Sequence, residues 1–174
     1  SERDTLEVSI SEISERSGLN HGLVKYYFGN KEGLLLALLE DIAVEAIGDL
    51  KRLAEKDLPP LTKIEKHIHG IVEKYGRYPY LNRLIAMLES TRPKNAEDLS
   101  RIFIIPLKTY QAKLIEEGKK TGEIRADLDP SLFYISLVGS CEFLFESRSR
   151  LTLALGSEVL DSELRHRYAK HVTA

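Results

Sequence analysis

The stretch GLNHGLVKYYFGNKEGLLLALL, from Gly18 to Leu39, decides the fold of this 174-residue chain. It opens with a glycine that can end a helix, because a residue without a Cβ atom enters the left-handed region at little cost. Asn20 is then a suitable N-cap for a second short helix, which we expect to reach Phe28. A break after Phe28 precedes a long helix with an apolar face. The stretch therefore predicts a short helix between two breaks, joined to a much longer helix.

Another short helix is predicted just before this stretch, over residues 10–16. Ser9 and Glu12 have the spacing of a capping box, in which each side chain bonds to the backbone N–H of the other residue. Two short helices with a glycine-containing turn between them are typical of a helix-turn-helix. On the second helix Val24 and Phe28 lie four residues apart, and we expect both to pack against the first helix.

The opposite face of the second short helix carries side chains that suit nucleic acid. His21 can read a base edge, Lys25 can pair with a phosphate, and Gly22 leaves the helix N-terminus open to a phosphate. We expect contacts to base edges and the nearby backbone from Asn20, His21, Gly22 and Lys25, and contacts mainly to phosphates from Ser9, Tyr26, Tyr27 and Lys31. The alternative is that the aromatic side chains belong to a core, since helix-turn-helix geometry also occurs in proteins that never touch DNA.

The composition narrows the class of protein. Apolar residues make up 43% of the chain and charged residues 30%, which is typical of a globular protein. The net charge of −2 gives the whole chain no basic signature for nucleic acid. A single cysteine, Cys141, excludes an internal disulfide framework. The most apolar segment, residues 132–145, is too short to span a bilayer, and no apolar signal region stands at the N-terminus. We therefore expect a cytoplasmic protein without a membrane partner.

Helical periodicity dominates the rest of the sequence, without convincing strand alternation. The long helix is expected over residues 31–54, because two prolines follow it closely. Further helices are predicted over residues 62–75, 80–90, 96–120 with a kink or break at Pro106, 131–148, and from residue 157 onward. The chain is therefore predicted to be all-α, with a helix-turn-helix head over residues 1–45 and a larger helical body over residues 46–174.

Residues 9–39 resemble the N-terminal domain of the TetR/AcrR family of transcriptional regulators. The positions that match the family pattern, without a gap, are Ile13, Ser14, Ser17, Gly18, Leu19, Asn20, Gly22, Tyr26, Tyr27, Phe28, Asn30, Lys31, Glu32 and Leu34. Lys25 stands where the family most often has tyrosine, and a lysine can serve the same phosphate or a guanine. Gly29 replaces the commoner proline, and Ser14 and Ser17 replace alanines.

The resemblance implies a DNA-binding transcriptional regulator, which we expect to be a repressor that a small-molecule effector releases from a palindromic operator. It also implies a three-helix head whose first helix precedes Ser9. The segment before Ser9 shows no amphipathic pattern, so we expect this first helix to be missing from the sequence.

The resemblance further implies that the body encloses the effector and that the last two helices form the interface of a homodimer. The candidate effector-binding residues are His67, Tyr75, Leu84, Met87, Leu88, Phe103, Leu107, Tyr110 and Phe143, the last facing inward from the penultimate helix. The candidate interface residues, small side chains and an apolar stripe in steps of four, are Ser136, Gly139, Ser140, Leu160, Leu164 and Tyr168. The alternatives are that the first set is ordinary core and that the last two helices pack within one chain.

No constellation typical of an enzyme is found in the sequence. Glu163 and His166 match half of a di-iron motif, but no second Glu-x-x-His exists. A glycine-rich phosphate loop is also absent from the sequence. We therefore expect no catalytic site, no metal site and no cofactor. The rival hypothesis is a helical small-molecule-binding protein whose head is a surface for another protein.

Overall fold

The computed structural model describes residues 9–18, 20–147, 151–153 and 161–172. The all-α prediction is confirmed, and no strand occurs in this described part of the chain. Among the residues singled out above, Leu19 and Leu160 lie outside the described ranges, as do the start of the chain and residue 157. In chain order the helices are α1 (Ile10–Ser17), α2 (His21–Phe28), α3 (Lys31–Ala54), α4 (Pro60–Arg77), α5 (Leu81–Thr91), α6 (Pro93–Leu99), the π-helix η1 (Ser100–Ile104), α7 (Ile105–Thr121), α8 (Pro130–Glu146) and α10 (Ser162–Val172).

Polar caps fix the ends of the first helices, as the sequence predicts. The Ser9 hydroxyl accepts a hydrogen bond from the Glu12 backbone N–H, and the Glu12 carboxylate accepts one from the Ser9 backbone N–H. Gly18 ends α1 in the left-handed region with φ of 69°. The side chains of Asn20 and Asn30 cap α2 and α3 by accepting hydrogen bonds from backbone N–H groups. These local bonds set the angles at which the chain enters each helix.

The predicted break at Pro106 is confirmed, and it takes the form of a π-helical turn. One helix was expected over residues 96–120, but α6, η1 and α7 occupy this part of the chain. The Ile105 N–H donates to the carbonyl of Ser100, five residues earlier. In a regular α-helix Pro106 would offer no N–H and its ring would clash with the preceding turn. The wider turn just before the proline removes that conflict.

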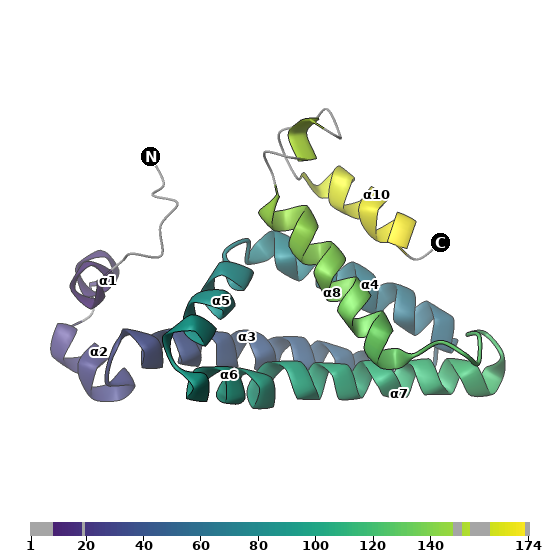
Figure 1. The fold of residues 1–174 in the computed structure, drawn as a ribbon, viewed down its shortest axis with the longest axis horizontal. Helices are drawn as coiled ribbons and strands as arrows, with labels where there is room; N and C mark the ends of the chain where they lie inside the picture. Colours follow the sequence, from purple (N-terminus) through teal and green to yellow (C-terminus); the bar gives the residue numbers. More distant parts are fainter. Residues whose placement is uncertain (1–8, 19, 148–150, 154–160, 173–174) are drawn as a thin grey trace.

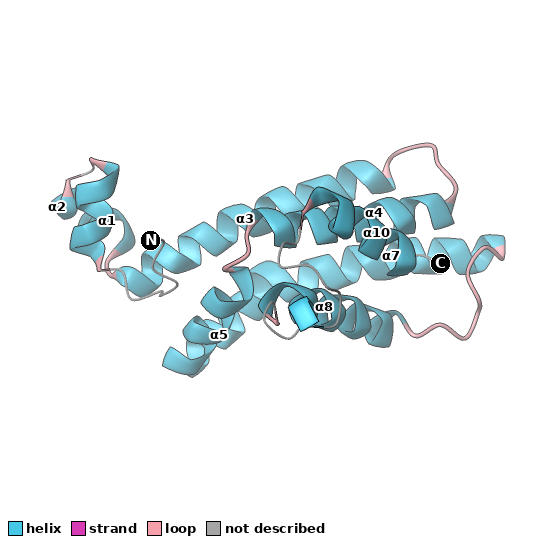
Figure 2. Cartoon of the chain, turned by 90° about the horizontal axis from the view of Figure 1, so that it is seen from above, coloured by secondary structure: helices cyan, strands magenta, loops and turns pink. Residues whose placement is uncertain are grey.

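The long helix α3 connects the head to the body. In Figure 1 the short helices α1 and α2 lie at one end of α3, and the other helices gather along the remainder of its length. Figure 2, from above, shows α4 and α7 running beside α3, with α5 set apart toward the head, and Figure 1 shows α8 slanting relative to α3 and α7. With 24 residues, α3 is about 36 Å long. A continuous rod of this length couples the position of the head to the packing of the body.

Two separate apolar clusters hold the body together. The proximal core, near the head, consists of Leu39, Ile42, Leu81, Leu84, Leu88 and Leu99. The distal core consists of Leu50, Ile64, Ile68, Val72, Tyr75, Leu114, Ile115, Leu137, Cys141, Leu144, Phe145 and Ala169. Since α3 contributes Leu39 and Ile42 to the first cluster and Leu50 to the second, it takes part in both.

Candidate DNA-binding surface and effector site

The outer face of α2 is open to solvent. Val24 is buried between α2 and its neighbours, as expected, but Phe28 buries only part of its ring. Tyr26 and Tyr27 are 82% and 73% exposed, and their rings meet edge to face with centroids 5.3 Å apart. Large aromatic side chains left outside a fold are available to an external partner. The alternative that these two tyrosines are core residues is therefore wrong.

All of the predicted DNA contacts on α2 and its N-cap are exposed, and the structure adds detail to two of the predicted contacts. His21 and Lys25 are exposed one helical turn apart. The imidazole Nδ1 of His21 lies 3.5 Å from the hydroxyl of Ser11 on α1, which the sequence analysis did not single out. The Ser9 hydroxyl is engaged with Glu12, so a phosphate at Ser9 would have to replace the Glu12 carboxylate.

A network of charged side chains fastens α3 to α4. The Lys74 ammonium lies 2.8 Å from the Glu45 carboxylate and 2.7 Å from that of Asp49. Arg77 and the Tyr78 hydroxyl also donate to Glu45, each at 3.0 Å. Hydrogen bonding from Lys74 lowers the pKa of both carboxyl groups. The network links the helix that carries the head to a helix of the body.

The outward face of α8 carries an apolar stripe. Leu132, Ile135 and Phe143 are exposed on it, with Ser136 and Gly139 between them. The prediction that Phe143 faces inward is wrong, because this ring is 53% exposed. Residue 143 shares its helix face with residues 136 and 139, whereas residues 137, 141 and 144 form the buried face.

The remaining predicted interface residues pack closer to their own chain. Tyr168 lies against the distal core and Leu164 is half-buried. The Ser140 hydroxyl donates to the carbonyl of Ser136. On α10, Arg165 pairs with Glu73 of α4 at 3.2 Å. The helix α10 is therefore docked on the body of its own chain, which leaves α8 with the exposed apolar surface.

The candidate effector residues divide between the two cores. Leu84 and Leu88 belong to the proximal core, against which Met87 and Phe103 pack. Tyr75 belongs to the distal core, against which Leu107 and Tyr110 pack, and His67 is buried on the same helix as Tyr75. None of the nine candidates lines either of the two pockets described next.

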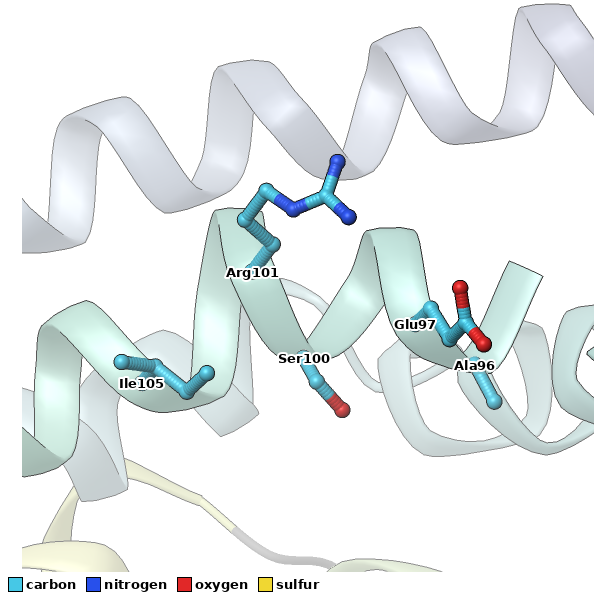
Figure 3. A pocket seen from close by; sticks show the side chains of 5 residues that line it. All are labelled: Ala96, Glu97, Ser100, Arg101 and Ile105. Atoms are coloured by element: carbon cyan, nitrogen blue, oxygen red, sulfur yellow. The ribbon is translucent and has the colours of Figure 1, made fainter. Parts of the chain in front are cut away.

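The first of these pockets is a surface depression along α6, η1 and α7. Its volume is about 450 Å³, and its lining residues are Ala96, Glu97, Ser100, Arg101 and Ile105. Figure 3 shows Arg101 extending toward the neighbouring α3, while the Ser100 side chain points the opposite way. Arg101 also pairs with Asp98 at 3.6 Å. The lining side chains diverge and do not enclose a ligand.

The second pocket is a smaller apolar groove of about 180 Å³, which we call the distal groove. It lies where α4, the end of α7, the start of α8 and the end of α10 meet. Its lining residues are Leu61, Ile64, Glu65, Ile68, Ile115, Glu123, Ile124, Leu128, Phe133 and Val172. Sequence reasoning missed this groove, because its walls come from four separate parts of the chain.

A buried polar pair lies between α4 and α7. His67 is buried, and burial lowers the pKa of its imidazole to about 4, although the neighbouring Gln111 side chain acts in the opposite direction. Gln111 is 1% exposed, and apart from this interaction with His67 its amide makes no hydrogen bond among the described residues. The sequence analysis named His67 but not Gln111. The available signal was one glutamine at a helical spacing shared with Leu107, Leu114 and Ile115.

The described residues contain neither a cluster of metal-ligating side chains nor a helix that could span a membrane. The rings of His69 and His166 lie 5.3 Å apart, but no group of three or more His, Cys, Asp or Glu side chains gathers in that part of the chain. Burial raises the pKa of the Cys141 thiol to about 12, so this thiol is not a reactive nucleophile. No helix of the described residues has the length and hydropathy needed to cross a bilayer.

Comparison with known proteins identifies the family. The family profile described as bacterial regulatory proteins, tetR family, matches residues 1–38, and the one described as tetracyclin repressor-like, C-terminal domain, matches residues 57–174. The chain belongs to the TetR family. It is therefore a DNA-binding transcriptional regulator, and the predicted resemblance is confirmed.

Individual members of the TetR family agree with this assignment. The chain is 24% identical over 162 residues to the HTH-type transcriptional repressor NicS of Pseudomonas putida, covering 90% of this chain and 74% of that protein. It is 26% identical over 153 residues to the HTH-type transcriptional regulator RutR of Escherichia coli, covering 87% and 71%. The transcriptional regulator FadR from Bacillus subtilis has the same fold, with a TM-score of 0.73 at 16% identity over 97% of this chain and 88% of FadR. These TetR-family relatives are regulators rather than enzymes.

Proposed function

We propose that this protein is a homodimeric repressor that binds a palindromic operator and leaves it when an effector binds in the body. The exposed face of α2 carries this proposal. A capped helix that places His21, Lys25, Tyr26 and Tyr27 outward suits the major groove of DNA. In the proposal Asn20, Gly22, His21 and Lys25 lie nearest the base edges, and Ser9, Lys31 and the tyrosines hold phosphates.

The apolar stripe of α8 supports the dimer. A helix-turn-helix regulator that reads two half-sites needs two heads at a fixed spacing, which a two-fold interface provides. Leu132, Ile135 and Phe143 would be covered by the same helix of a second copy, and Gly139 would let the two helices approach closely. The charged network between α3 and α4 would then pass a change in the body to the head.

The body suits a small-molecule effector. FadR from Bacillus subtilis is described in complex with stearoyl-CoA, so a protein of this fold accommodates a ligand. We propose that the effector of this chain binds between α4, α7 and α8, next to the distal core.

Selection of bound sequences from a random pool of duplex DNA tests the proposal. The protein is unfolded and refolded to remove any bound effector, and it is used at near-physiological salt. We expect a palindromic site with two equivalent half-sites. Recovery of no DNA by a folded dimer would contradict the proposal and favour a head that contacts another protein.

Two variants separate base contacts from phosphate contacts. Lys31→Ala should weaken binding about equally across sequences and reduce the salt slope by about one. His21→Ala should relax specificity at one position of each half-site, because it removes a base-edge contact. If both variants lost affinity uniformly, the base-reading role of His21 would be wrong.

A further inference from the structure

The distal groove combines apolar walls with two acidic side chains. Ile64, Ile68 and Ile115 belong to the distal core and are buried, and they also line the groove. Of the ten lining residues, all except Glu65 and Glu123 are apolar. A concave, mainly apolar surface with a few polar groups is the usual form of a small-molecule site. The groove therefore suits the apolar part of a ligand, and the two carboxylates decide which polar group it can carry.

The two carboxylates come from different elements and belong to one side of the groove. Glu65 lies on α4, and Glu123 lies in the loop that follows α7. The Glu123 carboxylate accepts hydrogen bonds from the Leu61 backbone N–H and from the Thr121 hydroxyl, each at 3.0 Å, so it is fixed at the start of α4. Because Leu61 and Glu65 are one helical turn apart, they share a face of α4.

Both carboxylates keep the capacity to bind a further donor. The half-buried Glu65 makes no hydrogen bond or ion pair with any residue that the structure describes. Each oxygen of Glu123 accepts one hydrogen bond within the chain, and a carboxylate oxygen has a second lone pair. A ligand that donates hydrogen bonds and carries positive charge would satisfy both groups.

The chain itself places no positive charge in the groove. Within the described ranges, no cationic side chain lines it. Lys63 bonds to the Ala54 carbonyl at 2.7 Å and lies 3.7 Å from the Glu117 carboxylate. Lys66 follows Glu65 directly, and adjacent residues of a helix do not face each other. A ligand ammonium group would therefore meet two carboxylates without a competing cation, whereas a ligand carboxylate or phosphate would be repelled.

We propose that the distal groove binds a small organic cation, which consists of an ammonium group on a short apolar chain. The ammonium group pairs with Glu65, and the apolar chain lies against Ile64, Ile68 and Ile115. With three N–H donors, the ammonium group also reaches a free lone pair of Glu123. The inference rests on the proposed function only in taking this cation as the effector.

The volume of the groove sets the size of the probe. Because a water molecule occupies about 30 Å³ in the liquid, 180 Å³ corresponds to about six waters, which suits a chain of about six carbon atoms. Hexylammonium, 1-hexanol and hexanoate share such a chain and differ in charge. Titration with each, followed by ¹H–¹⁵N NMR, should shift amide signals of the groove residues. Hexylammonium should bind about tenfold more tightly than 1-hexanol, with hexanoate weakest, and this preference should shrink as the salt concentration rises.

Glu65→Gln is the decisive variant, since glutamine keeps the shape of the side chain and removes its charge. It should weaken the binding of hexylammonium by about tenfold, to the affinity for 1-hexanol, and leave the binding of 1-hexanol unchanged. The matched control is Glu40→Gln, which removes the same charge from an exposed position of α3 outside the groove and should change neither affinity. A merely structural Glu65 would change the binding of both compounds equally.

Three results would overturn the inference: no binding of hexylammonium in the groove, equal or tighter binding of hexanoate, or an unchanged preference for hexylammonium in Glu65→Gln. DNA selection on the same preparation separates the two proposals. Operator binding without hexylammonium binding refutes only the cation site. Hexylammonium binding that depends on Glu65, without operator binding, keeps the cation site and refutes the repressor. Where both bind, hexylammonium should weaken the affinity for the operator, and an unchanged affinity would refute its role as effector.

Discussion

The head and the body of this protein are stabilised in different ways. Within the described residues of α1 and α2, only Ser14 and Val24 are buried, and side-chain caps define the helix ends. In the body, Val72, Leu114 and Ile115 are completely buried in a core that five helices share. In the head, Tyr26 and Tyr27 are exposed to solvent. In the body, the polar side chains of His67 and Gln111 are buried. The head is therefore held mainly by local caps, and the body mainly by the burial of apolar side chains.

Truncation of a side chain in the distal core should lower the free energy of unfolding more than any other change considered below. Leu114→Ala removes a fully buried side chain and should lower the free energy of unfolding by about 2–5 kcal/mol. Urea denaturation followed by circular dichroism measures this loss. Leu23→Ala, on the exposed face of α2, is the control and should change the free energy by less than about 0.5 kcal/mol. A similar loss for both variants would remove the contrast between body and head.

Acid should lower the stability of the body, because His67 is buried in its neutral form. The unfolded imidazole has the ordinary pKa of 6.5, but the folded one has a pKa of about 4, so the unfolded state binds the proton more readily. Stability is therefore lost as the pH falls from 6.5 toward 4, by about 3 kcal/mol in order of magnitude. His67→Gln should flatten the dependence of the unfolding free energy on pH in this window. Parallel curves for the two proteins would show that His67 is not buried in its neutral form.

Loss of the N-cap of α3 should destabilise the junction between head and body, by less than the two changes above. Asn30→Ala removes the acceptor for the Gly33 N–H at the start of α3 and should cost about 1 kcal/mol. Hydrogen exchange should show the loss as faster exchange in α2 and the first turn of α3, with the distal core unchanged. Asn30→Ser, which restores a capping oxygen, should recover most of the protection. Equal acceleration in the body would mean that head and body unfold as one unit.

The charged network should give the smallest effect on stability. Lys74→Met removes two ion pairs whose carboxylates have pKa values below the ordinary 4.5 and 3.8. Because carboxyl groups with lowered pKa values stabilise the fold while they are ionised, the melting temperatures of the two proteins should differ at pH 7 and converge as the pH falls through those lowered values. Arg101→Met, which removes the pair with Asp98 outside the network, is the control. A difference that persists in acid would assign the effect to packing of the lysine stem.

Local features of the fold could be predicted from the sequence, whereas features made by several helices could not. Ser9, Gly18 and Asn20 act within a few residues of their own position, so their spacing sufficed to locate the helix ends. Phe143 was assigned to the wrong face, because α8 is apolar on most sides and its periodicity does not identify the buried one. Gln111 resembles a surface residue in sequence, since its burial results from the packing of α4 against α7.

The continuity of α3 turns small changes in the body into larger movements of the head. Lys31 lies about 21 Å along the helix from Glu45, where the charged network grips α3. A tilt of about 5° at that point would swing the start of α3 through about 2 Å. In a two-fold dimer, such a tilt in both copies would change the distance between the heads by up to about twice that amount. A small tilt of α3 within the body therefore changes the spacing at which two heads would meet adjacent major grooves.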